Sequence, residues 1–340
     1  MDNIRIGVIG MGLMGYAHAR IYESLPYVEL VGCVETFDGK RKEMQQKLTC
    51  PVFATTDELY AIGIDAVSIC TPDQLHKDAV LEAFSHKVKV LVEKPLDVAS
   101  VSAQAMLDAR PDPTYLMVGH DLHYDPRVIS AKRDILAGKL GNIKYISTKR
   151  TSSFLTGKRI GGRTSVAWYL GIHDMELVLW LTGIKIKKVE SALGVKTMSP
   201  NWDCVSALIA MENGAVMNLS AHWIFPGVHA QEGDSMIQIF GDRGVAEISF
   251  LKNEYSFTPV DNEGRQKFFD VHYQPDDLSG IPAGDLRYEI EAFVRAVMKN
   301  ECPPITGEDA IAAVKVIEDI EKILETTGAD LRQNVNHNQL

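Results

Sequence analysis

The sequence has 340 residues, which suggests two domains, and its 46% hydrophobic and 24% charged residues are typical of globular proteins and exclude collagen-like, coiled-coil and disordered chains. The 45 acidic residues outnumber the 35 Lys and Arg residues, and the resulting net charge of −10 argues against a nucleic-acid partner. No signal-peptide pattern, long apolar run or C-x-x-C pair is found, so we expect a cytoplasmic protein without membrane contact, disulfide framework or metal site.

The first 121 residues alternate short apolar runs with helical patterns. The expected strands are 4–9, 28–34, 66–70, 88–92 and 115–118, and the expected helices are 13–25, 38–48 (with Asp38 as N-cap), 74–84 and 98–109. Strands that are apolar throughout are typical of a parallel sheet covered on both faces. The pattern therefore predicts a doubly wound α/β dinucleotide-binding domain over residues 1–121.

Residues 122–340 have a different pattern, in which a block of strands follows a pair of helices. We expect helices at 126–137 and 173–181, the second closed by Gly183, and a strand at 143–151 followed by a Gly- and Arg-rich loop at 157–163. Strands with hairpin turns at 212–214 and 241–244 follow, then helices at 285–299 and 308–326 and a frayed end. This predicts a second domain of the α+β class with a mostly antiparallel open sheet. We expect this domain to bind the substrate and to form the contacts of oligomerisation.

A glycine-rich segment lies directly after the first expected strand and opens a helix. It reads Gly10-Met11-Gly12-Leu13-Met14-Gly15. In this G-x-G-x-x-G pattern the first glycine permits a tight turn, the second lets a pyrophosphate approach the backbone, and the third allows close packing of helix on strand. Phosphate oxygens would then face the free N–H groups of the helix start. We expect a bound dinucleotide here.

Glu35 follows the second expected strand, where a carboxylate can accept hydrogen bonds from the adenosine ribose. Its charge would repel a 2′-phosphate and favour NAD over NADP. Lys40 and Arg41 leave NADP open, because they are close enough in sequence to meet a phosphate if Glu35 turns away. The alternative for Glu35 is a solvated charge at the end of a strand.

Two further motifs end the third and fourth expected strands. The first contains Thr71, Pro72 and His76, and the second is Glu93-Lys94-Pro95. In a doubly wound sheet these ends face the cofactor. A partly desolvated lysine there can take a hydroxyl proton while a hydride leaves carbon. Taken alone, His76 is equally consistent with the surface of a helix, and Glu-Lys-Pro with a surface turn.

The order of these motifs resembles that of the Gfo/Idh/MocA oxidoreductases over nearly the whole chain. The similarity extends to 118–120, 141–143, Gly171-Ile172-His173-Asp174 and 306–310. It implies a Rossmann domain, an α/β domain with an open sheet, and NAD or NADP exchanging hydride with a secondary alcohol of a sugar, nucleotide sugar or cyclitol. It also implies that Lys94 is the proton-transfer residue and that the Lys94–Pro95 bond is cis.

The resemblance adds His173, which in family dehydrogenases points at the substrate hydroxyl. The position four residues earlier, often aspartate in polyol dehydrogenases, is Tyr169 here. A neutral tyrosine can form a hydrogen bond but cannot act on Lys94 by charge. Either Lys94 and His173 work unaided, or an acid such as Asp121 or Asp174 assists.

The expected substrate-binding residues follow the domain junction. Lys149, Arg150, Lys158, Arg159 and Arg163 concentrate positive charge and indicate either an anionic substrate or a solvated basic loop. Trp168 can stack on a sugar ring or pack in the core. We also expect Asp121 and His123 in this site. The alternatives for function are an NADP-linked sugar reductase, a nucleotide-sugar dehydrogenase and a nucleotide-binding regulatory protein without turnover. By family analogy the chain forms a homodimer or homotetramer.

Overall fold

The computed structural model describes residues 3–225, 234–250, 254–259, 267–270, 280–281 and 283–326. The chain divides into two compact units, the first comprising Met1–Tyr124 and Tyr273–Val314, the second Asp125–His272 and Lys315–Leu340. Helix α9 (Asp285–Lys299) thus belongs to the first unit, whereas the sequence pattern assigned it to the second. Across these described ranges, no helix combines the length and apolarity that crossing a membrane requires.

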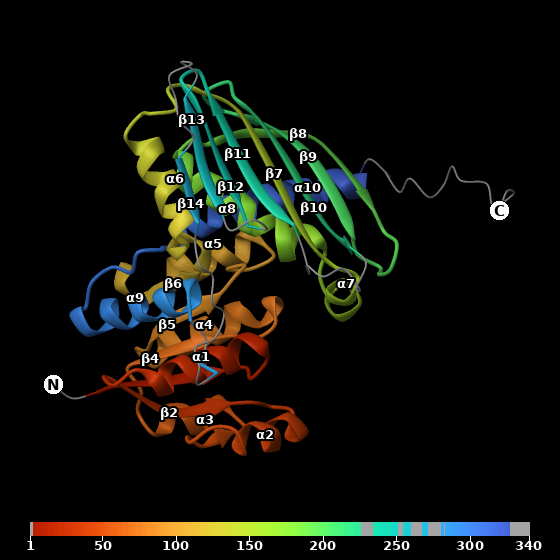
Figure 1. Ribbon diagram of the computed structural model, residues 1–340. Helices are drawn as coiled ribbons and strands as arrows, with labels where there is room; N and C mark the ends of the chain where they lie inside the picture. Colours follow the sequence, from red (N-terminus) through yellow and green to blue (C-terminus); the bar gives the residue numbers. More distant parts are fainter. Residues whose placement is uncertain are drawn as a thin grey trace, which may run out of the picture. The chain divides into compact units, whose positions relative to one another are not determined.

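Unit 1 is built on a six-stranded parallel sheet of order β3-β2-β1-β4-β5-β6 (Figure 1). Its strands are β1 (Ile4–Ile9), β2 (Val28–Val34), β3 (Val52–Phe53), β4 (Ala66–Ile69), β5 (Lys89–Glu93) and β6 (Leu116–Gly119). The strand order reverses between β1 and β4, and in such sheets ligands bind beyond the carboxyl ends of the strands at this point. The predicted doubly wound domain is confirmed.

The helices of unit 1 follow the strands in the expected alternation. They are α1 (Leu13–Ser24), α2 (Asp38–Gln45), α3 (Thr56–Ala61), α4 (His76–Ser85) and α5 (Ser100–Ala109). Strand β3 and helix α3 were not predicted. Asp38 is not an N-cap, because Phe37 holds that position. Because Gly7 and Gly32 have no Cβ, strands β1 and β2 can pass close to the side chain of Leu59 in α3.

Unit 2 contains an eight-stranded sheet of order β14-β13-β12-β11-β7-β10-β9-β8 (Figure 1). Its strands are β7 (Ile143–Ser153), β8 (Ile186–Val195), β9 (Cys204–Met211), β10 (Val216–Phe225), β11 (Ser235–Gly241), β12 (Gly244–Ser249), β13 (Glu254–Pro259) and β14 (Lys267–Asp270). Only the β7–β10 pairing is parallel among these strands, so the predicted mostly antiparallel sheet is confirmed. Both expected hairpins form, between β9 and β10 and between β11 and β12.

Helices cover one face of this sheet. Helices α6 (Pro126–Leu136) and α8 (Ile172–Thr182) pack on each other and on the sheet, and α8 ends at Gly183 with φ +66° as expected. The expected loop at 157–163 is partly wrong, because α7 (Phe154–Ile160) forms behind the N-cap Ser153. The last helix, α10 (Gly307–Thr326), begins in unit 1 and ends in unit 2. The expected frayed end lies outside the described residues.

Candidate functional site

The glycine-rich turn joins β1 to α1 with the geometry that the motif predicts. Gly10 has φ +90°, and a Cβ there would lie 2.8 Å from the carbonyl oxygen of Cys70 at the end of β4. A Cβ on Gly15 would lie 1.8 Å from the carbonyl oxygen of Gly10. Both positions therefore require glycine, the first for its dihedral angle and the second for the close approach of α1.

The start of α1 fits the pyrophosphate of a dinucleotide. A Cβ on Gly12, the N-cap, would meet no atom within 4 Å, and no side chain from the described ranges caps the helix. N–H groups at the helix start are therefore available to phosphate oxygens. Beside them the hydroxyl of Thr71 is buried without a hydrogen-bond partner among the described residues. Met11 is fully buried, whereas Leu13 is exposed and Met14 is half-buried.

Glu35 lies against this turn. Its Oε2 accepts a hydrogen bond from the backbone N–H of Met11 at 3.3 Å, and its Oε1 accepts one from the N–H of Phe37 at 2.9 Å. Glu35 is half-buried, and its two backbone contacts argue against the alternative of a freely solvated charge. An acid held beside the phosphate turn is in the position that contacts the adenosine ribose in Rossmann domains.

The two cations that left NADP open both form ion pairs with acidic side chains of α2. Lys40 pairs with Glu43 at 3.1 Å, and Arg41 pairs with Asp38 at 2.5 Å. Arg41 also donates to the backbone carbonyl of Glu35 at 3.2 Å. With Glu35 turned toward Met11, these interactions favour NAD over NADP.

The motifs after β4 and β5 are connected by His76. Its Nδ1 lies 2.8 Å from the carbonyl oxygen of Pro95 and its Nε2 lies 3.0 Å from that of Thr71. The ring is fully buried, so the alternative of a helix-surface histidine is wrong. The Lys94–Pro95 bond is cis, as the resemblance implied, and Lys94 is half-buried beside buried Glu93. Pro72 is exposed.

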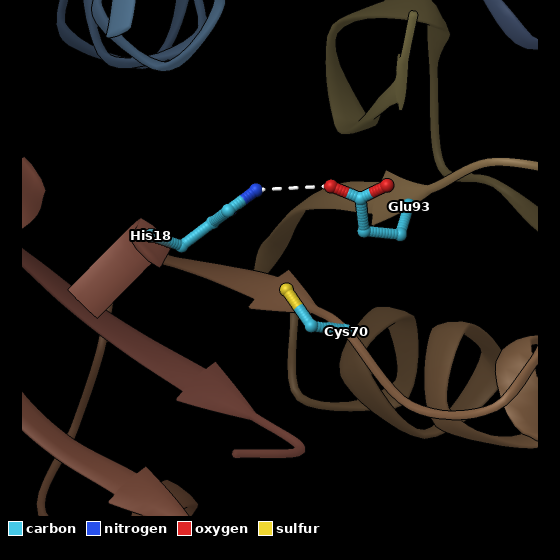
Figure 2. Close-up of side chains that lie close together, drawn as sticks. All are labelled: His18, Cys70 and Glu93. Carbon is cyan, nitrogen blue, oxygen red and sulfur yellow. Dashed lines mark hydrogen bonds and ion pairs between the residues drawn. The ribbon is translucent and has the colours of Figure 1, made fainter. Parts of the chain in front are cut away.

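Three side chains that could bind a metal, from His18 of α1, Cys70 and Glu93, lie close together; His18 and Glu93 are buried and Cys70 is half-buried. A ring nitrogen of His18, the sulfur of Cys70 and a carboxylate oxygen of Glu93 all lie within 4.8 Å of one another (Figure 2). Both ring nitrogens of His18 have hydrogen-bond partners, Ser68 at 3.1 Å and Glu93 at 3.0 Å. Burial, with the negative charges of Glu93 and Glu289, raises the pKa of the Cys70 thiol, which disfavours the thiolate that binds metals. We therefore interpret His18 and Glu93 as members of a hydrogen-bonded network with Ser68, and not as metal ligands.

In unit 2, a π-helical turn (Ala167–Gly171) carries two expected site residues, Trp168 and Tyr169, and leads into α8, which carries a third, His173. Tyr169 and His173 are half-buried, and the Tyr169 ring lies 6.1 Å from that of Trp223. A π-helical turn is wider than an α-helical turn. Tyr169 and His173, which are four residues apart, are therefore not related around the helix axis as they would be in a regular α-helix. Trp168 is buried, which argues against the expected stacking on a sugar and favours core packing.

The basic stretch of unit 2 is partly neutralised. Arg150 pairs with Asp174 of α8, with 2.7 Å between Nε and Oδ1, and Lys149 pairs with Asp234. Asp174 is almost completely buried, and that burial raises its pKa although the Arg150 charge opposes the shift. Arg150 is therefore engaged within the unit, and its expected role in binding an anionic substrate stays a prediction. Arg163 is exposed.

The last expected substrate residues lie in a short 3₁₀ turn, η3 (Asp121–Tyr124), at the end of the first segment of unit 1. His123 is buried and its ring stacks on that of His120, with 6.3 Å between the ring centres. Asp121 is half-buried. A role in substrate binding stays a prediction for both residues.

Comparison with known proteins identifies the family. Residues 4–120 match the oxidoreductase-family NAD-binding Rossmann fold, and residues 132–322 match the oxidoreductase-family C-terminal alpha/beta domain. Since the two matches span most of the sequence, the chain belongs to the Gfo/Idh/MocA family. It is an NAD(P)-dependent dehydrogenase with an NAD-binding domain, and the predicted family, fold and cofactor are confirmed.

The chain is similar to relatives over almost their full length. It is 28% identical over 318 residues to UDP-N-acetylglucosamine 3-dehydrogenase of Acidithiobacillus ferrooxidans, covering 92% of this chain and 96% of the relative. It is 26% identical to scyllo-inositol 2-dehydrogenase (NAD(+)) of Bacillus subtilis, covering 92% of each. The solved structure of the Acidithiobacillus enzyme superposes with a TM-score of 0.81 at 26% identity, covering 96% of this chain and 99% of that chain.

Proposed function

We propose that this dehydrogenase oxidises a secondary alcohol of a sugar, nucleotide sugar or cyclitol, with Lys94 as the proton-transfer residue. The observation that carries the proposal is the position of Lys94, at the end of β5 on the sheet edge where the glycine turn follows β1. The two relatives named above act, by their names, on a nucleotide sugar and on an inositol. Their similarity over most of the chain supports this substrate class.

Lys94 has the chemistry that the reaction needs. Bound NAD supplies a nicotinamide that accepts hydride from the alcohol carbon. The Nζ atom of Lys94, as a neutral amine, takes the hydroxyl proton and becomes an ammonium group while the C–O bond becomes a carbonyl. In the reverse direction the ammonium returns that proton to the carbonyl oxygen. Half-burial of Lys94 limits the access of water to this exchange.

We propose His173 and Tyr169 as further groups that contact the substrate hydroxyl. Both have polar atoms at the tip of a half-buried side chain near the start of α8. Asp121 and His123 remain additional candidates. The division of labour that we propose is cofactor binding by residues 1–121 and substrate binding by residues 122–340.

A nucleotide sugar is favoured within this class by one specific comparison. The UDP-N-acetylglucosamine 3-dehydrogenase is 28% identical to the chain. Its substrate carries a diphosphate, and the exposed side chains of Lys158, Arg159 and Arg163 are suited to binding one. An uncharged inositol would make no use of these cations.

The proposed function is tested by the absorbance of reduced nicotinamide. The purified protein is incubated with NAD⁺ or NADP⁺ and, separately, with UDP-N-acetylglucosamine, scyllo-inositol, myo-inositol and simple hexoses. We expect reduction of NAD⁺ in preference to NADP⁺, with the nucleotide sugar as the best substrate. If none of the sugars or cyclitols supports the reduction of NAD⁺, the proposed substrate class is contradicted.

We further propose that the chain forms a homodimer or homotetramer through the outer face of the unit 2 sheet. The strand register aligns five exposed apolar side chains on this face, which are Tyr145, Leu193, Leu208, Val216 and Ile224. Light scattering is expected to give a multiple of the chain mass. Leu193→Lys with Leu208→Lys should lower it, whereas Leu136→Lys on α6 should not; a monomeric parent would refute the assembly.

A further inference from the structure

Two fully buried histidines hold the residues on either side of Lys94. His18 Nε2 lies 3.0 Å from Oε1 of Glu93, and His76 Nδ1 lies 2.8 Å from the carbonyl oxygen of Pro95. The two rings come from different helices, α1 and α4. The lysine is therefore the middle residue of a segment that is anchored at both ends.

His18 is itself fixed by a chain of hydrogen bonds. The Tyr22 hydroxyl lies 2.7 Å from Ser68 Oγ, which lies 3.1 Å from His18 Nδ1. Burial raises the pKa of Tyr22, despite the hydrogen bond to Ser68, so its hydroxyl remains a donor. Every group is satisfied when Tyr22 donates to Ser68, Ser68 donates to His18, and His18 Nε2–H donates to Glu93. Figure 2 shows the ring and the carboxylate facing each other across this last bond.

The chain reaches the backbone of Lys94 through Glu93. Burial by itself raises the pKa of Glu93, but the hydrogen bond from His18 and the positive charges nearby outweigh it, so the pKa is lowered. The second carboxylate oxygen, Oε2, accepts a hydrogen bond from the backbone N–H of Lys94 at 3.3 Å. The orientation of the lysine backbone is thus coupled to the ring of His18.

His76 anchors the other side. Its second nitrogen, Nε2, lies 3.0 Å from the carbonyl oxygen of Thr71, so the ring connects the turns that follow β4 and β5. Both partners are backbone carbonyl oxygens, which act only as hydrogen-bond acceptors. The carboxylates of Glu93 and Asp97 interact electrostatically with the ring.

We propose that His18 and His76 are positioning residues that hold Lys94 in the geometry required for proton transfer. The proposal rests on the proposed function of Lys94. Displacement of a reacting group by about 1 Å can cost on the order of 100-fold in rate. Neither ring needs to touch the cofactor or the substrate to have this effect.

The kinetic test compares His18→Leu and His76→Leu with His86→Leu. His86 is a matched control because it is the C-cap of α4, the helix that begins at His76. Unlike His76, it is exposed, and its ring stacks on that of Tyr60. With the substrate identified above, we expect each of the first two variants to lose about 10- to 100-fold in kcat, with a smaller change in KM. His86→Leu should keep the parent rate, and His18→Gln, which retains an N–H donor, should recover part of the loss.

The same variants are then combined with Lys94→Ala. If the histidines act through Lys94, neither should lower the residual rate of Lys94→Ala further. Equal losses in both backgrounds would mean that the histidines act independently of the lysine, and the proposal would be overturned.

A second readout requires neither substrate nor turnover. The rate at which acetic anhydride acetylates Lys94 is measured by peptide mass spectrometry, with the exposed Lys87 as internal reference. We expect His18→Leu and His76→Leu to raise the Lys94 rate severalfold and His86→Leu to leave it unchanged. Ser68→Ala, which removes only one hydroxyl from the chain of hydrogen bonds, replaces His18→Leu if that variant fails to fold. If the acetylation rate of Lys94 is unchanged in these variants, the positioning proposal is overturned. If that rate changes but Lys94→Ala keeps normal turnover, only the proposed function of the lysine is overturned.

Discussion

The carboxylate of Glu35 accepts a hydrogen bond from the backbone N–H of Met11, with 3.3 Å between Oε2 and the nitrogen. This contact joins the acid after β2 to the glycine turn after β1. It also keeps a negative charge beside the turn that we expect to bind the cofactor. We therefore expect residues at the ends of two neighbouring parallel strands, β1 and β2, to determine the choice between NAD and NADP.

Replacing Glu35 by Ser should weaken NAD binding and relax discrimination against NADP. Loss of hydrogen bonds to a charged group costs about 1.5–3 kcal/mol, and the repulsion of a 2′-phosphate is lost with it. Fluorescence titration with both cofactors provides the measurement, with Glu29→Ala as the control on the same strand. If the ratio of NAD affinity to NADP affinity is the same in the parent and in Glu35→Ser, Glu35 does not belong to the cofactor site.

Gly12→Ala and Gly15→Ala should separate binding from folding. A Cβ at position 12 enters open space, whereas one at position 15 would lie 1.8 Å from the Gly10 carbonyl oxygen. We expect Gly12→Ala to retain the parent melting temperature and bind NAD more weakly. Gly15→Ala should lose about 1–3 kcal/mol of unfolding free energy. Normal NAD affinity in Gly12→Ala would show that the phosphate does not approach this glycine.

The regular parts of the fold were predictable because local patterns determine them. The apolar run of β1 and the glycines that follow it specify a strand, a tight turn and a helix without reference to the rest of the chain. Helix α3 was missed although its signal is local too. Thr55 and Glu58 form a capping box at its start, and this pattern is visible in the sequence.

The pairing of site residues was not predictable in this way. Arg150 and Asp174 are 24 residues apart, and His18 and Glu93 are 75 apart. Spacing along the chain carries no information about such contacts, because they depend on how strands and helices pack. The expected substrate role of Arg150 was therefore argued from charge alone, and the importance of His18 was missed.

Arg150→Met should destabilise the protein rather than weaken substrate binding. The variant leaves the buried Asp174 carboxylate without its cation, and breaking a buried pair in this way costs about 3–5 kcal/mol. Chemical denaturation measures the loss, and Lys144→Met, at an exposed position of β7, is the control. The double variant Arg150→Met/Asp174→Leu should recover most of the stability. A raised KM with unchanged stability would restore Arg150 as a substrate contact.

Glu93 should contribute to the acid sensitivity of the protein. Because its folded-state pKa lies below the ordinary value of 4.5, the folded state favours the carboxylate. The resulting stabilisation is complete above that ordinary value and is lost as the pH falls through the folded-state pKa. Melting temperatures from pH 7 to pH 3 should therefore fall more steeply for the parent than for Glu93→Gln. Parallel curves would contradict the lowered pKa.

The turnover of Lys94→Ala tests the central claim most directly. With the substrate identified by NAD⁺ reduction, we expect kcat to fall by about 100- to 10,000-fold, the usual contribution of one acid–base group, while NAD affinity measured by fluorescence changes little. Lys94→Arg should not restore the rate, because a guanidinium keeps its proton, and Lys87→Ala should match the parent. Near-normal turnover in Lys94→Ala would contradict proton transfer by this lysine.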